Sequence, residues 1–121
     1  MHIILACAAG MSTSLLANNM QKVAAERGMD VTVDALSTSA LDEGQWRGAD
    51  VVLVGPQMRH QLPLLQEQGA AYRVPVAAIP PQDYAIANGQ RVLEQATSLV
   101  ESQAFRQEAG QPNTRNDGGV K

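Results

Sequence analysis

Two short runs of consecutive apolar residues constrain the fold more than any other feature of this sequence. They lie within a predicted first strand at His2–Ala6 and a predicted third strand at Val51–Val54. A strand that is apolar at every position packs on both of its faces, which is typical of the central strands of a parallel sheet. Helix-like stretches separate the strand-like runs along the chain, and this alternation predicts an α/β fold.

Two further strands are less uniformly apolar and are predicted at the edges of the sheet. Residues Val31–Ala35 alternate between apolar and polar side chains, so one face of this strand is expected to contact water. Residues Val74–Ile79 contain Pro75 near their start, and central strands avoid proline. With right-handed crossovers, these positions predict a single open four-stranded parallel sheet of order 2-1-3-4, with helices on both faces.

Apolar residues at helical spacing predict the segments that connect the strands. The first helix should end before Gly28, Pro63 should lie in the first turn of a later helix, and Asn88 should cap the last helix. The segment that follows Ser37 fits either a short helix or an irregular crossover. The side chains expected on the buried faces of the first and last helices are Leu16, Met20, Val23, Ala24, Val92, Ala96 and Leu99.

The chain has 121 residues, which suits one domain and one core. We assign the domain to residues 1–103. From Ala104 to Lys121 the sequence is rich in Gln, Asn, Gly and charged residues and has few apolar residues. Such a segment cannot bury enough surface to order itself, so residues 104–121 are predicted to form a disordered tail.

Composition argues against several kinds of partner and site. The net charge of −3 and the 3% aromatic content disfavour binding to nucleic acid or to an anionic membrane. A single cysteine cannot form an internal disulfide or a multi-cysteine metal site, and no carboxylate cluster suggests a metal, so we expect no metal and no cofactor. We find neither a signal-peptide pattern nor a run long enough to insert into a membrane, so a cytoplasmic location is expected.

That cysteine, Cys7, begins a loop of small residues between the first strand and the first helix. Such a loop directs backbone N–H groups and the positive end of the helix dipole at one point, where a phosphate can bind. Electropositive surroundings favour the thiolate, which could attack phosphorus, although a buried structural cysteine is an alternative. The predicted phosphate-binding residues are Ala8, Ala9, Gly10, Met11, Ser12, Thr13 and Ser14. The hydroxyl groups among them either donate to phosphate or cap the helix.

The loop does not match other common phosphate sites. The sequence has neither of the glycine-rich nucleotide-binding motifs, Gly-x-x-x-x-Gly-Lys-Ser/Thr or Gly-x-Gly-x-x-Gly. Cysteine phosphatases place an arginine where this chain has Thr13, and without its guanidinium there is no bidentate clamp for a phosphoryl group in transit. We therefore expect a loop that holds a phosphoryl group rather than one that hydrolyses it quickly. A cysteine-dependent phosphatase and a non-catalytic phosphate-binding module remain as alternatives.

The chain has two histidines, and neither is predicted to be a site residue. His60 follows the third strand and is interpreted as a solvated surface residue. His2 begins the first strand, so we expect it at the opposite end of the sheet from Cys7, without a partner that would make a site.

The segment Cys7–Leu16 closely resembles the phosphorylation loop of the lactose/cellobiose class of enzyme IIB, a component of sugar phosphotransferase systems. Residues Ala49–Gln57 resemble that family's third strand and following turn, and Leu62-Pro63 resembles its next helix start. The segment from Tyr84 to Gly89 resembles the stretch before its last helix. The resemblance covers residues 1–103. The sequence departs from the family pattern at Pro80 and Ala85, which lie outside the cysteine loop.

This resemblance implies an enzyme that acts as a phosphotransferase and carries phosphate on cysteine. The donor would be a phosphohistidine on a IIA protein, and Cys7 would be the nucleophile. The acceptor would be a sugar similar to cellobiose, chitobiose or lactose, bound by a IIC membrane transporter. The protein would then be cytoplasmic and would meet the inner face of the membrane transiently, through its IIC partner.

Overall fold

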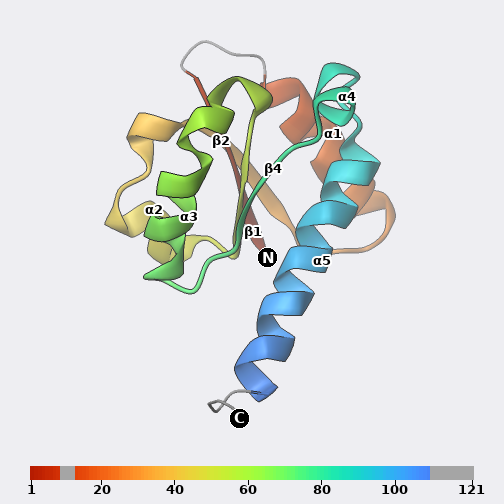
Figure 1. The fold of residues 1–121 in the computed structure, drawn as a ribbon. Coiled ribbons are helices and arrows are strands. Elements are labelled where there is room, and N and C mark those ends of the chain that lie inside the picture. Colours follow the sequence, from red (N-terminus) through yellow and green to blue (C-terminus); the bar gives the residue numbers. More distant parts are fainter. Residues whose placement is uncertain (9–12, 110–121) are drawn as a thin grey trace.

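The computed structural model describes residues 1–8 and 13–109, which form one parallel sheet with helices on both faces (Figure 1). For residue 13 and residues 104–109 only the backbone is described. The sheet has four strands in the order β2-β1-β3-β4, so the predicted order is confirmed. The strands are β1 (His2–Cys7), β2 (Thr32–Ser37), β3 (Val51–Val54) and β4 (Val76–Ala78).

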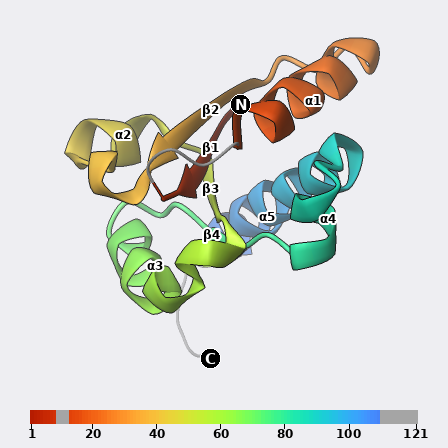
Figure 2. The same ribbon diagram turned by 90° about the horizontal axis from the view of Figure 1, so that it is seen from above.

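The helices divide between the two faces of the sheet. Figure 2 shows α1, α4 and α5 on one face, and α2 and α3 on the other. Two short 3₁₀ segments, η1 and η2, follow β2 and β3. The bounds are α1 (Thr13–Glu26), η1 (Thr38–Ala40), α2 (Glu43–Gly48), η2 (Pro56–Gln61), α3 (Leu62–Ala70), α4 (Pro81–Ala85) and α5 (Gly89–Ala109). Within the described ranges, we find no helix with the length and apolar character needed to cross a bilayer.

The core consists of two apolar layers separated by the sheet. Ile3 and Leu5 of β1 pack toward α1 and α5, whereas Ile4 and Ala6 pack toward α2 and α3. This division follows from the alternation of side chains along a strand. Every residue of β3 is likewise inaccessible to solvent. Burying a Leu, Ile or Val side chain contributes about 1.5–3 kcal/mol, so these two central strands supply much of the stability.

The edge strand β4 is protected by two glutamine side chains. Gln66 of α3 donates through Nε2 to the Val76 carbonyl oxygen at 3.1 Å, and Gln95 of α5 donates to the Ala78 carbonyl oxygen at 2.9 Å. An edge strand with unoccupied carbonyls can pair with another chain. These two amides occupy the acceptors that an additional strand would use.

The first helix ends where the sequence predicts. Gly28 adopts a left-handed conformation with φ of 68°, and the Met29 N–H donates to the Ala24 carbonyl at 2.8 Å. This arrangement satisfies a carbonyl that the helix leaves without a partner. Glycine adopts positive φ without strain, which explains why the helix stops here.

The crossover from β2 to β3 contains a short helix, one of the two structures that the sequence allowed, and a 3₁₀ turn precedes it. The 3₁₀ turn η1 comes first, and the six-residue helix α2 follows. The Asp42 side chain caps α2 by accepting from the Gln45 N–H at 2.9 Å. Trp46 of α2 is 3% exposed and fills the layer between this helix and the sheet.

The last helix begins at its predicted cap but extends further than predicted. Asn88 accepts from the Arg91 N–H through Oδ1 at 3.2 Å. The α5 backbone then continues to Ala109, whereas the sequence predicts disorder from Ala104. Ala, Gln, Glu and Arg in this stretch have high helix propensity, so a helix that is already formed can continue through them. The rest of the predicted tail, residues 110–121, lies outside the described residues.

Candidate functional site

Cys7 is the last residue of the central strand β1, at the carboxyl end of the sheet. It pairs in register with Ser37 of β2, and on the other side Ala6 pairs with Val54 of β3. Cys7 is 5% exposed, and its thiol donates to the Leu36 carbonyl oxygen with an Sγ to O distance of 3.6 Å. The single thiol therefore lies at the edge of a parallel sheet where ligands of α/β proteins usually bind.

A long helix begins six residues after Cys7. Ala8 is half-buried, and α1 begins at Thr13 and has 14 residues. The first turn of α1 contains no acidic residue that would compete for its N–H groups, which have no acceptors within the helix. Ser14, in that turn, is exposed. The predicted cradle residues Ala9, Gly10, Met11 and Ser12 lie outside the described residues, as does the Thr13 side chain.

Gly55 and Tyr84 lie beside the end of β1. The Gly55 N–H donates to the Ala6 carbonyl at 2.8 Å, which places Gly55 next to the residue that precedes Cys7. A Cβ atom at Gly55 would lie 3.1 Å from Gln57 Oε1 and 3.7 Å from the ring carbon Cε1 of Tyr84. The distance to Tyr84 is that of an ordinary van der Waals contact, so the Tyr84 ring lies next to Gly55, directly after β3.

The carboxyl end of the sheet has a different charge from the molecule as a whole. The described segments that leave the four strands there are 7–8, 13–15, 37–40, 55–62 and 79–90. Their ionisable side chains are Arg59 and His60, both exposed, and Asp83, which is 6% exposed and pairs with Arg91 Nε at 3.3 Å. These segments thus present no exposed carboxylate, although the chain has a net charge of −3. An approaching phosphate dianion meets little local repulsion.

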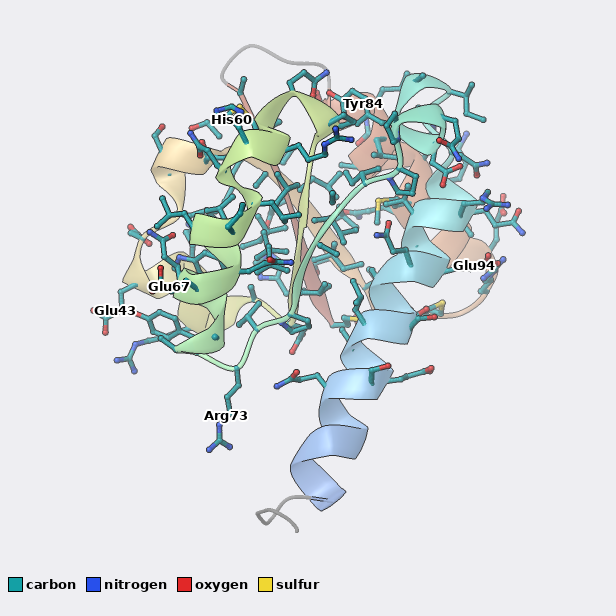
Figure 3. The ribbon with its side chains drawn as sticks, in the orientation of Figure 1. Glu43, His60, Glu67, Arg73, Tyr84 and Glu94 are labelled. Atoms are coloured by element: carbon teal, nitrogen blue, oxygen red, sulfur yellow. The ribbon has the colours of Figure 1, made fainter. Side chains whose placement is uncertain are left out.

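The two histidines occupy opposite ends of the molecule. His60 is exposed on η2, as the sequence predicts, and Figure 3 shows it at the Cys7 end of the sheet. His2 is half-buried at the opposite end of the sheet, as expected, but it has two hydrogen-bond partners that the sequence did not indicate. Its Nε2 lies 2.6 Å from Asp34 Oδ2 and its Nδ1 lies 3.0 Å from the Gly48 carbonyl oxygen. This cluster joins β1, β2 and the end of α2, far from Cys7. We interpret it as a set of contacts that stabilises the fold.

The described part of the chain offers no metal site, since no three His, Cys, Asp or Glu side chains gather in it. The sequence alone did not predict Tyr84 as a site residue. Tyr84 follows β4 and is remote from Cys7 in the sequence, so only the fold brings it to the same edge. The one signal available was its place after the carboxyl end of a predicted strand.

Comparison with known proteins identifies a family that this chain matches over most of its length. The family described as "PTS system, Lactose/Cellobiose specific IIB subunit" matches residues 2–95. The galactose-specific EIIB component of Lactococcus lactis subsp. cremoris is 42% identical over 103 residues, covering 81% of this chain and 94% of the relative. The oligo-beta-mannoside-specific EIIB component of Bacillus subtilis is 39% identical over 101 residues, covering 84% of this chain and 97% of the relative.

A solved structure supports the fold. The solution structure of a cellobiose-specific phosphotransferase IIB component from Borrelia burgdorferi aligns with a TM-score of 0.71 at 33% identity. The alignment covers 85% of this chain and 94% of the other. The similarity therefore supports the fold described above.

Proposed function

The chain belongs to the lactose/cellobiose-specific IIB family of the sugar phosphotransferase system, and on that premise we propose that Cys7 is the residue that carries the phosphoryl group. As a member, the protein is a phosphotransferase component of sugar transport. The observation that carries the proposal is the position of Cys7. The chain's single thiol ends the central strand, and a 14-residue helix begins shortly after it.

In the first step, the Cys7 thiolate attacks the phosphorus of a phosphohistidine on a IIA protein. The S–P bond forms as the P–N bond breaks, and the electron pair of that bond stays on the imidazole nitrogen. The contact of the thiol with the Leu36 carbonyl is available only while sulfur is protonated, so the thiolate must turn toward N–H donors instead. The N–H groups of Ala8 to Ser14 are the donors that we assign to the bound phosphoryl group.

In the second step, a hydroxyl oxygen of the sugar bound by a IIC transporter attacks the same phosphorus. The O–P bond forms, the S–P bond breaks and Cys7 leaves as a thiolate, while the hydroxyl proton passes to a base or to solvent. Arginine is absent at position 13, where Thr13 stands, and this absence disfavours attack by water in place of the sugar. The loop thus holds the group until the acceptor arrives.

The surface around Cys7 supports docking of the two partners. Three large hydrophobic side chains in the described residues are more than half exposed: Leu15, Leu64 and Ile86. Leu15 and Leu64 lie in the first turns of α1 and α3, and Ile86 follows α4, so all three are near the carboxyl end of the sheet. Exposed apolar side chains of this kind mark protein interaction surfaces. We assign this end to IIA and IIC in turn, which makes the protein cytoplasmic and places it transiently at the membrane.

The class of sugar follows from the relatives. Their names specify galactose, oligo-beta-mannoside and cellobiose, and the family description adds lactose. We propose that this chain serves a β-linked disaccharide or a related sugar of the cellobiose, chitobiose or lactose type. The choice among these belongs to the transporter that binds the sugar.

The test is phosphorylation with phosphoenolpyruvate, the general phosphotransferase proteins and a matching IIA protein. Intact mass should show one added phosphate, and Cys7→Ser should reduce transfer at least 100-fold, because a serine hydroxyl is hardly ionised at neutral pH. Equal thermal unfolding of the two proteins is the control. Separated from its partners, the phosphoprotein should persist. Multiple turnover on an aryl phosphate would indicate a cysteine phosphatase instead, and a wild-type protein that no IIA phosphorylates would overturn the proposal.

A further inference from the structure

Tyr84 has a buried hydroxyl group that makes no hydrogen bond within the described structure. The side chain as a whole is half-buried, but its Oη atom is inaccessible to solvent, and no donor or acceptor of the described residues lies within reach. Buried polar groups in native proteins nearly always have partners, because an unsatisfied one destabilises the fold. Because the unpaired Tyr84 hydroxyl destabilises the fold, we expect it to have a partner in another state of the protein.

The surroundings of Tyr84 indicate where that partner is. Its ring packs against the core layer that contains Ile3, Leu5 and Leu16, on the α1 side of the sheet. Ring carbon Cε1 approaches the position of a Cβ on Gly55, whose N–H bonds to the residue before Cys7. Tyr84 belongs to α4, and Figure 3 shows it at the same end of the sheet.

The direction of Cys7 agrees with this placement. Side chains alternate along β1, with Ile3 and Leu5 on the α1 side and Ile4 and Ala6 on the α2 side. By the same alternation, Cys7 belongs to the α1 side. The thiol and the Tyr84 ring therefore share one face at one end of the sheet.

We propose that the Tyr84 hydroxyl donates a hydrogen bond to a phosphoryl oxygen when Cys7 carries phosphate. This inference rests on the proposed function. A phosphoryl group linked to sulfur presents three oxygens with negative charge, and a phenol is a hydrogen-bond donor well suited to one of them. The group that satisfies the buried hydroxyl thus arrives with the phosphate. No bond to Tyr84 forms or breaks in transfer.

The variant Tyr84→Phe keeps the ring and removes the donor. Phosphate acceptance from IIA should fall about ten- to a hundredfold, the range expected for a lost hydrogen bond to a charged group. The melting temperature should equal or exceed that of the wild type, because the hydroxyl has no partner to lose in the unphosphorylated fold. If the Tyr84 hydroxyl had only a structural role, phosphate acceptance and the melting temperature would fall together.

Tyr72→Phe is the matched control. Tyr72 is the chain's other tyrosine and stacks on Trp46 at a centroid distance of 6.4 Å, in the layer on the α2 side of the sheet. Removal of the Tyr72 hydroxyl should leave phosphate acceptance unchanged. The ³¹P signal of the phosphocysteine should shift in Tyr84→Phe and stay in place in Tyr72→Phe.

A second measurement avoids substitution at Tyr84. With 3-fluorotyrosine incorporated, the chain gives two ¹⁹F signals, which Tyr72→Phe assigns. Phosphorylation should move the Tyr84 signal and leave the Tyr72 signal in place. If the wild type accepts phosphate but Tyr84→Phe matches it in rate and in ³¹P shift, and the ¹⁹F signal of Tyr84 does not respond, the inference is wrong while the proposed function stands. Failure of the wild type to accept phosphate would overturn both.

Discussion

At the scale of single residues, Gly89 shows how closely two helices approach beside the site. A Cβ atom at Gly89 would lie 2.5 Å from the Asn19 carbonyl carbon and 2.7 Å from the Met20 nitrogen, both of them backbone atoms of α1. The Asn19 side chain also donates to the Ala87 carbonyl at 2.9 Å, which ties the same two regions together. Glycine is therefore required here for packing between α1 and α5.

We expect Gly89→Ala to destabilise the fold by about 1–3 kcal/mol, since the added carbon meets backbone that cannot move freely. Denaturant unfolding would measure this change. Gly44→Ala is the matched control, because a Cβ at Gly44 in α2 meets only Asp42 Oδ1, at 3.5 Å. That substitution should be neutral or stabilising by up to about 1 kcal/mol, as expected for replacing glycine within a helix. Equal losses in both variants would contradict the packing argument.

Some of these residue roles were visible in the sequence and others were not. Gly28 was predictable as a helix stop and Asn88 as a cap, because each acts on the backbone within a few positions of itself. Gly89 and Tyr84 act on α1 and on the end of β1, which are distant in the chain. Local pattern carries no information about such contacts. The partners of His2 were missed for the same reason, since Asp34 and Gly48 come from other elements.

At the scale of elements, the strands were easier to predict than the end of α5. Uniform apolar runs identified β1 and β3 as central, and the alternation in residues 31–35 identified β2 as an edge strand. Each of those predictions depends on which faces are buried. The extension of α5 to Ala109 depends instead on helix propensity, which a prediction based on burial ignores. The candidate site was predicted as a cysteine loop before a helix, whereas the segments that lie around Cys7 could be identified only from the fold.

The extension of α5 leads to a prediction about truncation. The last described α5 side chains that pack against the core are Leu99 and Val100. We therefore expect truncation after Gln103 to leave both the melting temperature and phosphate acceptance unchanged. Truncation after Ala96 is the control, and it should lower the melting temperature because it removes both of those contacts. A large loss of stability on truncation after Gln103 would show that residues beyond it pack on the domain.

At the scale of the whole molecule, charge is distributed unevenly between the two ends of the sheet. The carboxyl end presents Arg59 and His60 and no exposed carboxylate in its described segments, whereas acidic side chains such as Asp30, Asp50 and Glu67 lie elsewhere. A protein of net negative charge therefore offers a phosphorylated partner one end that does not repel it. The exposed hydrophobic side chains near the same end, Leu15, Leu64 and Ile86, add contact area once the partner has arrived.

Charge reversal at the two ends tests this distribution. Arg59→Glu should slow phosphoryl transfer from IIA about three- to tenfold at low ionic strength, because charges at the rim of an interface act mainly on the rate of association. The difference should shrink as salt is added and the charges are screened. Arg73→Glu changes the net charge equally, but Arg73 is exposed after α3 at the opposite end, as Figure 3 shows, so its transfer rate should stay close to that of the wild type. Equal slowing in both variants would mean that only the total charge matters. If neither slowed, association would depend on the apolar contacts around Cys7, and the charge of that end would have no part in bringing the donor to the thiol.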